Sequence, residues 1–575
     1  MNPLWKPRDS STEVETPSHV EGQWPPLIGK ILAARGFAES GDVEKLLFPK
    51  LADLKDPLLM KGMSQALERI SQAYLNKEKI CIYADFDLDG TSGLALLKTG
   101  LLALGFPEVL HYQPKRLSEG YGFHAAAVEE LQKQGVSLII TVDVGITAHA
   151  AINKAKEIGV DVILTDHHLP ADTIPEAYVV VNPNQGDCPS GLGYLCGAGV
   201  AFYLLRGLKR HFQDHPQLPK NNWDLKEVLD YFTIGTLTDM VPLVDDNRVL
   251  VKHGLMKLAE TKKAGLRALL EELDLVDRPL TSQDVAIRFA PKLNALSRME
   301  SGVLPIDIFL LDEPKKARDM VREVMKNNST RVQLQNDAEV EAQEILKGWQ
   351  YKDFVFVASR NFHRGVVGLI ATKLTQVFNK PAFVGSLGDD GMIVGSARLP
   401  QGQEACLVQA MSSAQELLSR FGGHSAAAGF EIAETRVSSF IEKLNGHFSD
   451  LREKPKPLEI FYDVEAQLSE VGAPLMKWYD FVGPFGAGFS IPLIHFSNIQ
   501  VLSKRDLKGG HLRLKISDGE GKSSAEALLF TPTPRQLETL QNVPGFYNIL
   551  GELQWNYFAG QKTVQILIRD LKAAT

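Results

Sequence analysis

Short apolar runs alternate with longer helical stretches between about residues 79 and 182. The four runs expected to be strands are 80–84, 138–142, 160–165 and 178–181. This alternation is typical of βαβ units in a parallel sheet. Open α/β sheets bind ligands beyond the carboxyl ends of their strands, near a topological switch point, so the residues that follow these runs are the first candidates for a functional site.

A long polar stretch predicts a single helix that begins near Asp312, with Pro314 in its first turn, and ends at Gly348. A helix of about 33 residues would span roughly 50 Å. Its apolar positions are too sparse for burial on all sides, so we expect a rigid spacer between two lobes. A coiled-coil dimer arm is the alternative, but the heptad pattern breaks at residues 327–331.

A second α/β lobe opens with the run 353–358 and continues to about residue 448, after which Pro455 and Pro457 mark a linker. Short runs beyond the linker predict a small all-β barrel or sandwich. These runs are 458–464, 494–502, 511–516, 525–530, 547–550 and 563–568. The expected division is a tail and lead-in at 1–45, a catalytic α/β domain at 46–300, the connecting helix at 301–349, a second α/β domain at 350–452 and the β domain at 456–575.

Length and composition place the chain among ordinary globular proteins. Its 575 residues exceed a single core and suggest three or four domains, while 44% hydrophobic and 23% charged residues are usual for a soluble chain. The N-terminus lacks an apolar signal core, and no run approaches the roughly 18 apolar residues of a membrane span, so we expect a cytoplasmic protein without a membrane partner. A net charge of −8 argues against nonspecific coating of nucleic acid but allows a local basic groove.

The cysteines offer no framework for metal or disulfides. Their spacing contains no Cys-x-x-Cys pair, so neither a disulfide scaffold nor structural zinc is expected. The four are Cys81, Cys188, Cys196 and Cys406.

Three carboxylates crowd the end of the first predicted strand: Asp85, Asp87 and Asp89 directly follow the run 80–84. Like charges so close repel one another, and a divalent cation bound by oxygen ligands relieves the repulsion. A calcium loop of the same spacing is excluded, because its twelfth position needs a bidentate Glu and Leu96 stands there. A solvated acidic turn capping the next helix remains the alternative to half of a metal site.

Further polar residues follow later apolar segments. Asp143 and Asp166 each come immediately after the last apolar residue of a predicted strand. His167 and His168 add two imidazoles, and a mixed set of imidazoles and carboxylates suits Mn²⁺ better than Ca²⁺. Asp239 interrupts an otherwise apolar segment, where a lone buried carboxylate would be costly. It is a further ligand candidate, with a helix cap or a salt bridge as the alternative.

These segments carry a family resemblance. Asp85-Phe-Asp-Leu-Asp-Gly, Val142-Asp-Val-Gly, Asp166-His-His and Gly235-Thr-Leu-Thr-Asp occur in the order of the four motifs of the DHH phosphoesterases. Later segments resemble the bacterial single-strand DNA exonucleases of this family and their DHH-associated domain: Asn294-Ala-Leu-Ser-Arg-Met, His363-Arg-Gly-Val-Val-Gly, Gly395-Ser-Ala-Arg and Gly422-Gly-His-Ser-Ala-Ala-Ala-Gly. The resemblance runs from about Leu27 to the C-terminus.

The resemblance implies a fold, an activity and partners. The fold is α/β, with a DHH lobe and a DHH-associated lobe joined by the long helix, followed by an all-β OB-fold. The activity is hydrolysis of single-stranded DNA from the 5′ end to 5′-mononucleotides with two Mn²⁺ or Mg²⁺ ions, in repair and recombination. A monomer is expected, and single-strand-binding protein and a RecQ-type helicase are partners that the resemblance alone implies.

Site residues are carried over motif by motif. The metal ligands implied are Asp87, Asp89, Asp143, His167 and Asp239. Residues implied to act at the reaction centre are Asp85, which coordinates metal or lies beside it, Asp166, which orients a neighbouring imidazole, His168, which donates to the scissile phosphate, and His424, which holds the substrate phosphate from the far side. The implied phosphate-binding set is Arg298, Ser396, Arg398 and Gly423.

Two segments depart from the family pattern. Ser297 replaces the usual Gly of Asn-Ala-x-Gly-Arg but leaves Arg298 in place. Phe485-Gly-Ala-Gly-Phe-Ser replaces Phe-Gly-x-Gly-Asn-Pro, which affects only the expected packing between the barrel and the rest of the chain. The barrel's basic residues fit either a DNA groove or a solvated hairpin, and its aromatics fit the core equally well, so none is assigned a base contact. They are Lys504, Arg505, Lys508, Arg513 and Lys515, with Trp478, Phe485 and Trp555.

Two other functions are compatible with parts of the pattern. A phosphoesterase of short oligonucleotides or small nucleotide phosphates would use the same metal site, but it would need only the two α/β lobes. A scaffold that has lost its metals would not need the intact acidic motifs. The long helix and the appended barrel therefore favour a polymeric DNA strand as the substrate.

Overall fold

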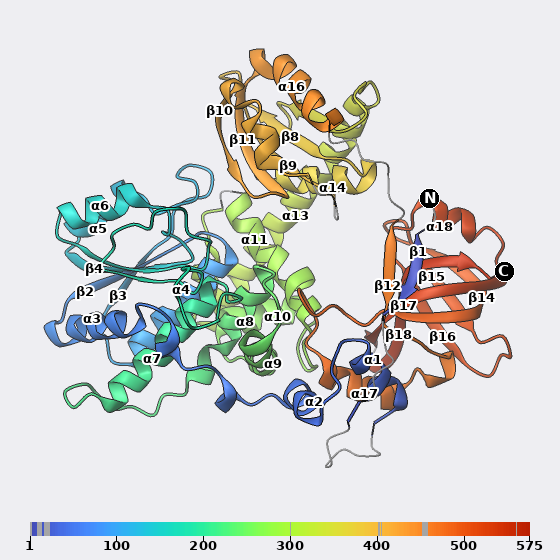
Figure 1. Ribbon diagram of the computed structural model, residues 1–575, viewed down its shortest axis with the longest axis horizontal. Helices are drawn as coiled ribbons and strands as arrows, with labels where there is room; N and C mark the ends of the chain where they lie inside the picture. Colours follow the sequence, from blue (N-terminus) through green and yellow to red (C-terminus); the bar gives the residue numbers. More distant parts are fainter. Residues whose placement is uncertain are drawn as a thin grey trace. The chain divides into compact units, whose positions relative to one another are not determined.

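The computed structural model describes residues 3–8, 14–15, 24–299, 301–400, 403, 405–450, 458–558 and 560–574. The chain forms two compact units (Figure 1). One contains Asp56–Asp239 and Gly254–Pro455, and the other contains Met1–Lys55, Met240–His253 and Lys456–Thr575. The domain boundaries expected from the sequence stay predictions.

The first lobe of the larger unit is built on a parallel sheet. Its strands are β2 (Lys79–Ala84), β3 (Val109–Tyr112), β4 (Val136–Val142), β5 (Asp161–Thr165) and β6 (Val179–Val181). They lie in the order β3-β2-β4-β5-β6, and every neighbouring pair is parallel. The chain reverses its direction of travel across the sheet between β2 and β4, which makes the edge beyond these two strands the topological switch point.

The sequence predicted four of these strands and missed β3. Only Val109 of β3 is buried, because the strand lies at the edge of the sheet, where Leu110 and Tyr112 are half-buried and His111 is exposed. A run of four residues with one buried position does not produce a strand signal.

Helices cover both faces of this sheet (Figure 1). They are α3 (Met63–Asn76), α4 (Leu88–Ala103) and α7 (Gly197–Asp214) on one face, and α5 (Ala125–Lys133) and α6 (His149–Glu157) on the other. Helix α4 is buried around most of its circumference, because it lies between the sheet, α7 and α8 (Leu229–Thr238). Gly100 makes the close packing possible, since a Cβ there would lie 2.3 Å from a methyl of Leu205.

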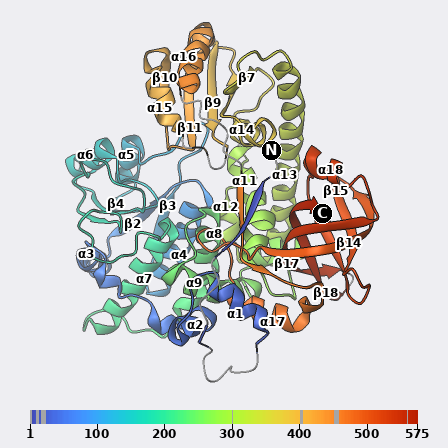
Figure 2. The ribbon, with the colours of Figure 1, turned by 45° about the vertical axis from the view of Figure 1, so that its right-hand side comes forward.

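The long helix α13 (Pro314–Leu346) connects the two lobes of this unit, as predicted from the polar stretch (Figure 2). Its buried residues form two separate groups: Ala317, Val321, Val324 and Asn328 near the start, and Ala338, Ala342 and Leu346 near the end. The first part contacts α10 (Ala264–Glu272), α11 (Ala290–Arg298) and α12 (Pro305–Phe309), and the last contacts β7 (Val355–Ser359) and α14 (Val367–Phe378). None of the described residues between Asn328 and Ala338 is buried, as expected of a spacer.

The second lobe contains a mixed sheet in the order β10-β11-β9-β8-β7. Strand β7 runs parallel to β8 (Ala382–Leu387), and the remaining pairs among β8, β9 (Met392–Arg398), β11 (Ala427–Ala433) and β10 (Leu418–Gly423) are antiparallel. Apolar residues of α15 (Leu407–Ser412) and α16 (Val437–Asp450) join the core on one face. Helix α14 and the end of α13 form a second core.

The smaller unit contains a closed β-barrel of the OB type, as predicted. Its ring consists of β14 (Ile494–Leu507), β15 (His511–Ser517), β16 (Ser524–Leu529), β18 (Gln561–Ala573) and β17 (Gly545–Phe558), which pairs back onto β14. The longest strands exceed the predicted runs because register shifts at residues 496–499 and 550–551 let them bend around the ring. Helix α18 (Pro534–Thr539) lies between β16 and β17 in the chain.

Segments before the first α/β lobe and after the second one add to the barrel unit. Strand β1 (Leu4–Pro7) pairs in parallel with β12 (Glu459–Tyr462), and β13 (Val464–Glu465) pairs with β14. Helices α1 (Pro26–Ala33), α2 (Ser40–Leu47) and α17 (Ala473–Val482) share the barrel core. The linker predicted at Pro455 and Pro457 lies outside the described residues.

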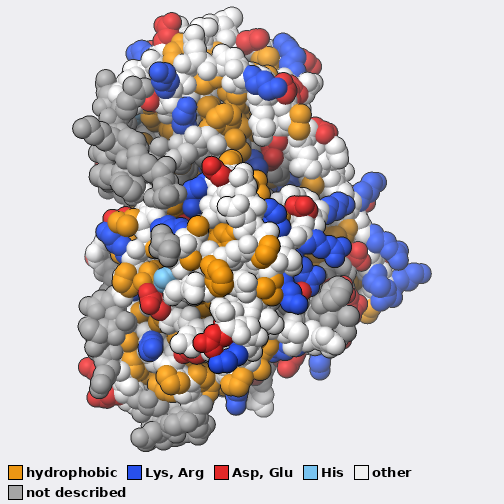
Figure 3. All heavy atoms as spheres, turned by 90° about the vertical axis from the view of Figure 1, so that its right-hand side faces the viewer, with side chains coloured by type: hydrophobic (Ala, Val, Ile, Leu, Met, Phe, Trp, Pro, Cys, Tyr) orange, Lys and Arg blue, Asp and Glu red, His pale blue; other side chains and the backbone are white. Residues whose placement is uncertain are grey.

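Side chains considered for DNA contacts divide between core and surface. Trp478 is buried in the barrel core, whereas the five basic residues of the β14–β15 region are exposed. Figure 3 shows Lys and Arg side chains gathered on one side of the face it presents, next to acidic and apolar ones. On the face shown, most of the basic side chains thus lie in one part of the surface. None of the described helices has the length and apolar character needed to cross a membrane.

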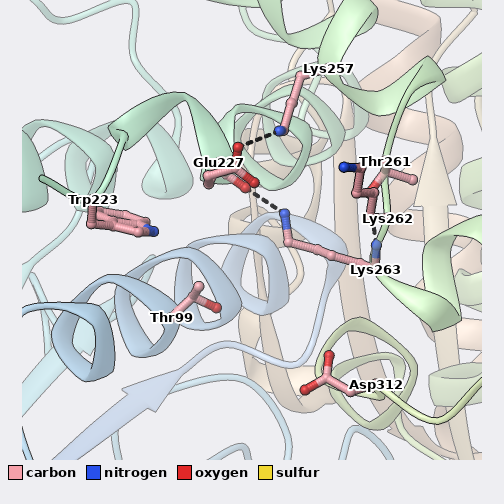
Figure 4. Close-up of a pocket in the computed structure, with 8 residues that line it drawn as sticks. All are labelled: Thr99, Trp223, Glu227, Lys257, Thr261, Lys262, Lys263 and Asp312. Atoms are coloured by element: carbon pink, nitrogen blue, oxygen red, sulfur yellow. Dashed lines mark hydrogen bonds and ion pairs between the residues drawn. The ribbon is translucent and has the colours of Figure 1, made fainter.

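Helix α8, which leads to Asp239, is fixed at its start by a buried ion pair. Asp230 is fully buried, and both of its oxygens lie 2.7 Å from Lys263 Nζ, while Thr261 Oγ1 donates to it at 2.9 Å. Lys263 also lines a pocket of about 400 Å³ beside α8 (Figure 4), where Lys257 pairs with Glu227 at 2.6 Å. The two lysines therefore differ mainly in the burial of their partners.

We expect Lys263→Met to lower the free energy of unfolding of this unit by about 3 kcal/mol, because it leaves the Asp230 carboxylate buried and uncompensated. Lys257→Met is the matched control and should cost at most about 1 kcal/mol, since Glu227 is half exposed and regains water. Urea unfolding followed by circular dichroism measures both values. Equal losses in the two variants would contradict the anchoring role of the Asp230 pair.

Candidate functional site

The carboxylates predicted at strand ends meet at one edge of the first sheet. Asp85 follows β2 and Asp143 follows β4, so these two flank the topological switch point, and Asp166 follows β5. All three are almost completely buried, with exposed fractions of 4%, 3% and 0%. Buried carboxylates at this edge form the core of a candidate site.

Three overlapping groups of side chains could each hold a metal ion. Within each group the candidate ligand atoms lie within 4.8 Å of one another. The groups are Asp143, His167 and His168; Asp89, His167 and Asp239; and Asp85, Asp87 and Asp143. The structure thus brings together all five predicted ligands and two of the residues predicted to act beside them.

His167 occupies the centre of this cluster. Its Nε2 atom lies 3.0 Å from Asp143 Oδ1, 3.7 Å from Asp239 Oδ2 and 3.9 Å from Asp89 Oδ2. Burial lowers the pKa of His167, which leaves the imidazole neutral and able to act as a nitrogen ligand.

The N-terminus of α4 holds Asp87. The Asp87 carboxylate caps the helix, accepting hydrogen bonds from the backbone N–H groups of Asp89 at 2.9 Å and Gly90 at 3.0 Å. The turn is tight: a Cβ on Gly90 would lie 2.5 Å from the carbonyl oxygen of Asp85. Strand end, cap and helix therefore place three carboxylates within five residues.

The N-terminus of α7 holds Asp89 in the same way. Its oxygens accept from the backbone N–H of Gly197 at 2.6 Å and of Ala198 at 2.9 Å. The positive end of the helix dipole stabilises this negative charge. Gly197 is required for the approach, because a Cβ there would lie 2.3 Å from Asp143 Cβ.

Asp143 has a left-handed backbone, with φ of 62°. Asp tolerates this conformation better than most residues, and such outliers occur where surrounding contacts over-determine the backbone. The left-handed turn ends β4 abruptly and leaves the Asp143 side chain beside His167.

Asp166 organises the pair of histidines. One oxygen accepts from His168 Nδ1 at 2.7 Å, and the other accepts from the backbone N–H of Ile146 at 3.0 Å. Burial alone would raise the pKa of Asp166, but these hydrogen bonds lower it. Burial likewise opposes protonation of His168, yet its bond to Asp166 raises the pKa of His168 to about 9.

The remaining carboxylates have the electrostatics of a cation site. Burial and repulsion from Asp87 raise the pKa of Asp85 to about 7, and burial and repulsion from Asp89 raise that of Asp239 to about 8. The pKa values of Asp87 and Asp143 are raised for the same reasons. One buried oxygen each of Asp85 and Asp143 has no hydrogen-bond donor among the described residues. Unsatisfied carboxylate oxygens beside a neutral imidazole fit Mn²⁺ or Mg²⁺.

A group of arginines lies next to this cluster within the same unit. Arg298 ends α11 and Arg398 ends β9, and none of the described carboxylates forms an ion pair with either. Burial, together with repulsion from Arg116, Arg331 and Arg398, lowers the pKa of Arg298 to about 9. Buried guanidinium groups without counter-ions are suited to an anion such as phosphate.

Ser396 lies beside these arginines. A Cβ on Gly368 would lie 3.1 Å from Arg398 Nη2 and 3.3 Å from Ser396 Oγ, so both side chains point at the start of α14. Arg298 Nη1 donates to the carbonyl oxygen of Gly365 at 3.2 Å. The loop before α14 thus connects the predicted phosphate-binding residues of the two lobes.

Sequence reasoning missed two residues at this site. Arg116 interacts electrostatically with Asp85 and Asp87 on one side and with Arg298 and Arg398 on the other. It lies in an irregular loop after β3, a strand that was itself not predicted, so no pattern marked it. Tyr121 follows in the same loop, with its hydroxyl 3.5 Å from His168 Nδ1.

The structure does not bring His424 to the cluster. His424 is exposed in the hairpin between β10 and β11, and its backbone N–H donates to Ala427 O at 2.8 Å. Within the described part of the chain its side chain joins none of the carboxylate groups. Gly423 beside it has φ of 146° and no room for a Cβ, which fits a backbone that turns sharply.

Comparisons with known proteins agree with this architecture. The models of the DHH family N-terminal domain, the DHHA1 domain and the RecJ OB domain match residues 79–236, 352–450 and 462–570. The single-stranded-DNA-specific exonuclease RecJ of Bacillus subtilis is 31% identical, over 95% of this chain and 68% of that protein. The protein of the same name from Salmonella typhimurium is 28% identical, over 97% of this chain and 98% of that protein.

A solved structure shows the same fold over the full length. The crystal structure of RecJ in complex with Mn²⁺ from Thermus thermophilus superposes with a TM-score of 0.78 at 26% identity, covering 100% of this chain and 80% of that one. A crystal structure of exonuclease RecJ bound to manganese is 32% identical and superposes with a TM-score of 0.58, covering 69% of this chain and 96% of that one. With its two α/β lobes, its barrel and its carboxylate cluster, the chain belongs to the RecJ family of DHH phosphoesterases.

Proposed function

We propose that this protein is a single-stranded-DNA-specific exonuclease that digests from the 5′ end and releases 5′-mononucleotides with two Mn²⁺ or Mg²⁺ ions, in DNA repair and recombination. The observation that carries the proposal is the arrangement of charges in one unit, where a carboxylate cluster suited to cations adjoins arginines without counter-ions. A hydrolytic centre next to an anion pocket supports cleavage close to a phosphorylated end.

The carboxylate cluster would hold the ions. The ligands proposed are Asp87, Asp89, Asp143, His167 and Asp239, with Asp85 coordinating or supporting them. When bound, such ions supply an activated water and neutralise negative charge on the phosphodiester. The hydrogen bonds to Asp87 and Asp89 from the ends of α4 and α7 keep these carboxylates in position.

His168 and Asp166 would act on the substrate side of the cluster. Because Asp166 accepts from Nδ1 of His168, the Nε2 atom of the ring is the one left to donate to a phosphate oxygen. Asp166 itself is fully buried and acts only by orienting the imidazole.

The arginines and Ser396 would select the end of the strand. The guanidinium groups of Arg298 and Arg398 can each donate two parallel hydrogen bonds to a terminal phosphate, and Ser396 Oγ adds a neutral donor. Arg116 lies between this pocket and the carboxylates, where it can contact the phosphates on either side. Gly423 and His424 belong to the proposal as a contact from the hairpin to the substrate phosphate.

The barrel would bind the part of the DNA strand that lies outside the reaction centre. The OB-type barrel, with exposed basic residues, supports a single strand that extends beyond the reaction centre. Single-strand-binding protein and a RecQ-type helicase as partners, a monomeric state and a cytoplasmic location complete the proposal.

Polarity is tested with single-stranded DNA labelled at either end, with and without a 5′-phosphate, in Mn²⁺ or Mg²⁺. We expect label at the 5′ end to appear first as a mononucleotide, and phosphorylated DNA to be digested faster. Release of the 3′ label first would disprove the proposed direction.

Asp143→Ala should lower the rate of Mn²⁺-dependent hydrolysis by about a thousandfold or more, since several kcal/mol of charge stabilisation would be lost. The metal-free protein should remain folded, because the substitution removes a source of repulsion. Asp161→Ala is the matched control, as Asp161 begins β5 and pairs with Arg69 instead of joining the cluster. Normal turnover in Asp143→Ala would rule out the metal assignment.

Arg298→Met should abolish the preference for a 5′-phosphate. Loss of a charge-assisted hydrogen bond costs about 1.5 to 3 kcal/mol, or roughly 10- to 150-fold in KM for phosphorylated DNA. KM for DNA with a 5′-hydroxyl should change little. Arg322→Met, on the exposed surface of α13, serves as the control for lost charge. An unchanged preference in Arg298→Met would show that the phosphate binds elsewhere.

A further inference from the structure

Asn182 occupies the strand end next to that of Asp166. It directly follows β6, which pairs in parallel with β5, so both residues lie at the carboxyl edge of the sheet, where the carboxylate cluster forms. Asn182 is fully buried. A buried amide is costly unless its donor and its acceptor both have partners, so the hydrogen bonds of Asn182 indicate what it does.

The Asn182 amide connects two backbone groups. Its Oδ1 atom accepts from the backbone N–H of Asn184 at 2.8 Å, and its Nδ2 atom donates to the carbonyl oxygen of His168 at 2.9 Å. Asn184 continues this arrangement, because its own Nδ2 atom donates to the carbonyl oxygen of His167 at 2.5 Å. The two amides thus bind the carbonyl groups of both histidines in the Asp-His-His motif.

Asp166 holds the remaining backbone groups of the two histidines. One of its oxygens accepts from the N–H of His167 at 2.8 Å and from the N–H of His168 at 3.1 Å. All four backbone polar groups of the pair therefore bond to side chains, and not to a sheet or a helix. A segment without regular secondary structure depends on such bonds for a fixed conformation.

A hydrogen-bond donor is required at both asparagine positions. A carboxylate of the same shape at either position would place an oxygen against the carbonyl oxygen of a histidine, where two acceptors repel each other. The space around Asn184 is also limited. A Cβ on Gly193 would lie 2.5 Å from Asn184 Oδ1, so this glycine leaves the amide the room it needs to reach His167.

We infer that Asn182 and Asn184 position the two imidazoles of the Asp-His-His motif for metal binding and phosphate contact. The inference rests on the proposed function, because it concerns how residues proposed to act there are held. Asn184 holds the peptide group between His167 and His168 and so acts on both rings, the first of which is a proposed metal ligand. Asn182 holds the peptide group after His168 and so acts on the ring proposed to contact the phosphate. Both asparagines are positioning residues, since they act through the backbone of the histidines.

Asn184→Asp should weaken Mn²⁺ binding about tenfold, the lower range for loss of a group that orients a ligand. The variant keeps the size of the side chain but replaces the donor by an oxygen, which repels the carbonyl oxygen of His167. Its added negative charge alone would strengthen the binding of a cation, so weaker binding indicates a displaced imidazole. Electron paramagnetic resonance of the free ion, in Mn²⁺ titrations of the full-length protein, measures the affinity.

Asn182→Asp should give a different balance of effects. The variant keeps the acceptor for the N–H of Asn184, so His167 stays in place and the Mn²⁺ affinity should equal or exceed that of the wild type. The kcat for 5′-phosphorylated single-stranded DNA at saturating Mn²⁺ should fall about tenfold, because His168 is no longer held toward the phosphate. A merely structural role of Asn182 would lower the affinity and kcat together.

Asn221→Asp is the matched control for loss of an amide hydrogen bond to a distant carbonyl. Asn221 makes the same pair of contacts, accepting from the N–H of Trp223 at 3.2 Å and donating to the carbonyl oxygen of Ala103 at 2.7 Å. Ala103 lies at the C-terminus of α4, the end opposite to Asp87. The variant should lose stability in urea but bind Mn²⁺ and digest DNA like the wild type.

Gly193→Ala tests the contact of Asn184 without changing either asparagine. Its Cβ displaces the Asn184 amide from His167, so Mn²⁺ binding should weaken as in Asn184→Asp. Gly193 is exposed, and the variant should therefore fold. It decides the question if Asn182→Asp fails to fold.

Each outcome either supports or overturns the inference. Weaker Mn²⁺ binding in Asn184→Asp and Gly193→Ala, together with a lower kcat in Asn182→Asp, supports it. Wild-type Mn²⁺ affinity in Asn184→Asp, wild-type kcat in Asn182→Asp, or the same losses in Asn221→Asp overturn it. A wild-type protein that neither binds Mn²⁺ nor digests DNA would overturn the proposed function as well, whereas an active wild type with unaffected variants would overturn the inference alone.

Discussion

Repulsion among buried aspartates is the interaction on which the arrangement of the first α/β lobe depends. Asp85 and Asp143 flank the switch point of the sheet, and Asp89 lies between them and α7. Two helix N-termini offset part of the cost by donating backbone N–H groups to Asp87 and Asp89. The charge that remains uncompensated is concentrated where a cation would bind. The sheet order, the glycine turns and the direction of both helices all serve this arrangement.

Next to the carboxylate cluster, the same unit buries positive charge on arginines that have no carboxylate partner among the described residues. Arg298 and Arg398 come from different lobes, yet repulsion from Arg398 helps to lower the pKa of Arg298. The spacer helix α13 and the loop at Gly365 keep the lobes connected. The carboxylate cluster and the arginine group are each costly to bury without a ligand of the opposite charge. Their presence in one unit therefore indicates a ligand with both a cationic and an anionic part. Together they suit a metal-bound phosphodiester that carries a terminal phosphate.

Local patterns predicted much of this architecture. The runs before Asp85, Asp143 and Asp166 are short, apolar and followed by carboxylates, and a pattern of that kind is visible without any tertiary information. The sparse apolar positions of α13 predicted a spacer that is not buried on all sides. Resemblance to a family supplied the roles of Arg298 and Arg398, which no pattern of their own would have revealed. Their roles stay predictions, as does that of His424, which lies exposed on its hairpin.

Features that depend on distant parts of the chain were not predictable. Strand β1 pairs with β12 although both α/β lobes lie between them in the chain, and no local signal specifies such a partner. Arg116 looks like an ordinary surface residue until the fold places it beside Asp85. Gly197 resembles any helix start, although its missing side chain lets α7 reach Asp89 and Asp143. In each case tertiary packing, not the neighbouring sequence, gives the residue its role.

The hydrogen bonds from α7 to Asp89 have a consequence for how the proposed metal ions would be bound. They are formed by backbone groups of the fold itself, so the most buried of the candidate ligands is held before any ion arrives. At the proposed site, ions would therefore bind to a carboxylate that the fold already holds in place, and the polypeptide would not need to refold around them. Folding of this lobe and loading of the proposed ions would then be two separate events, with the first setting the geometry for the second.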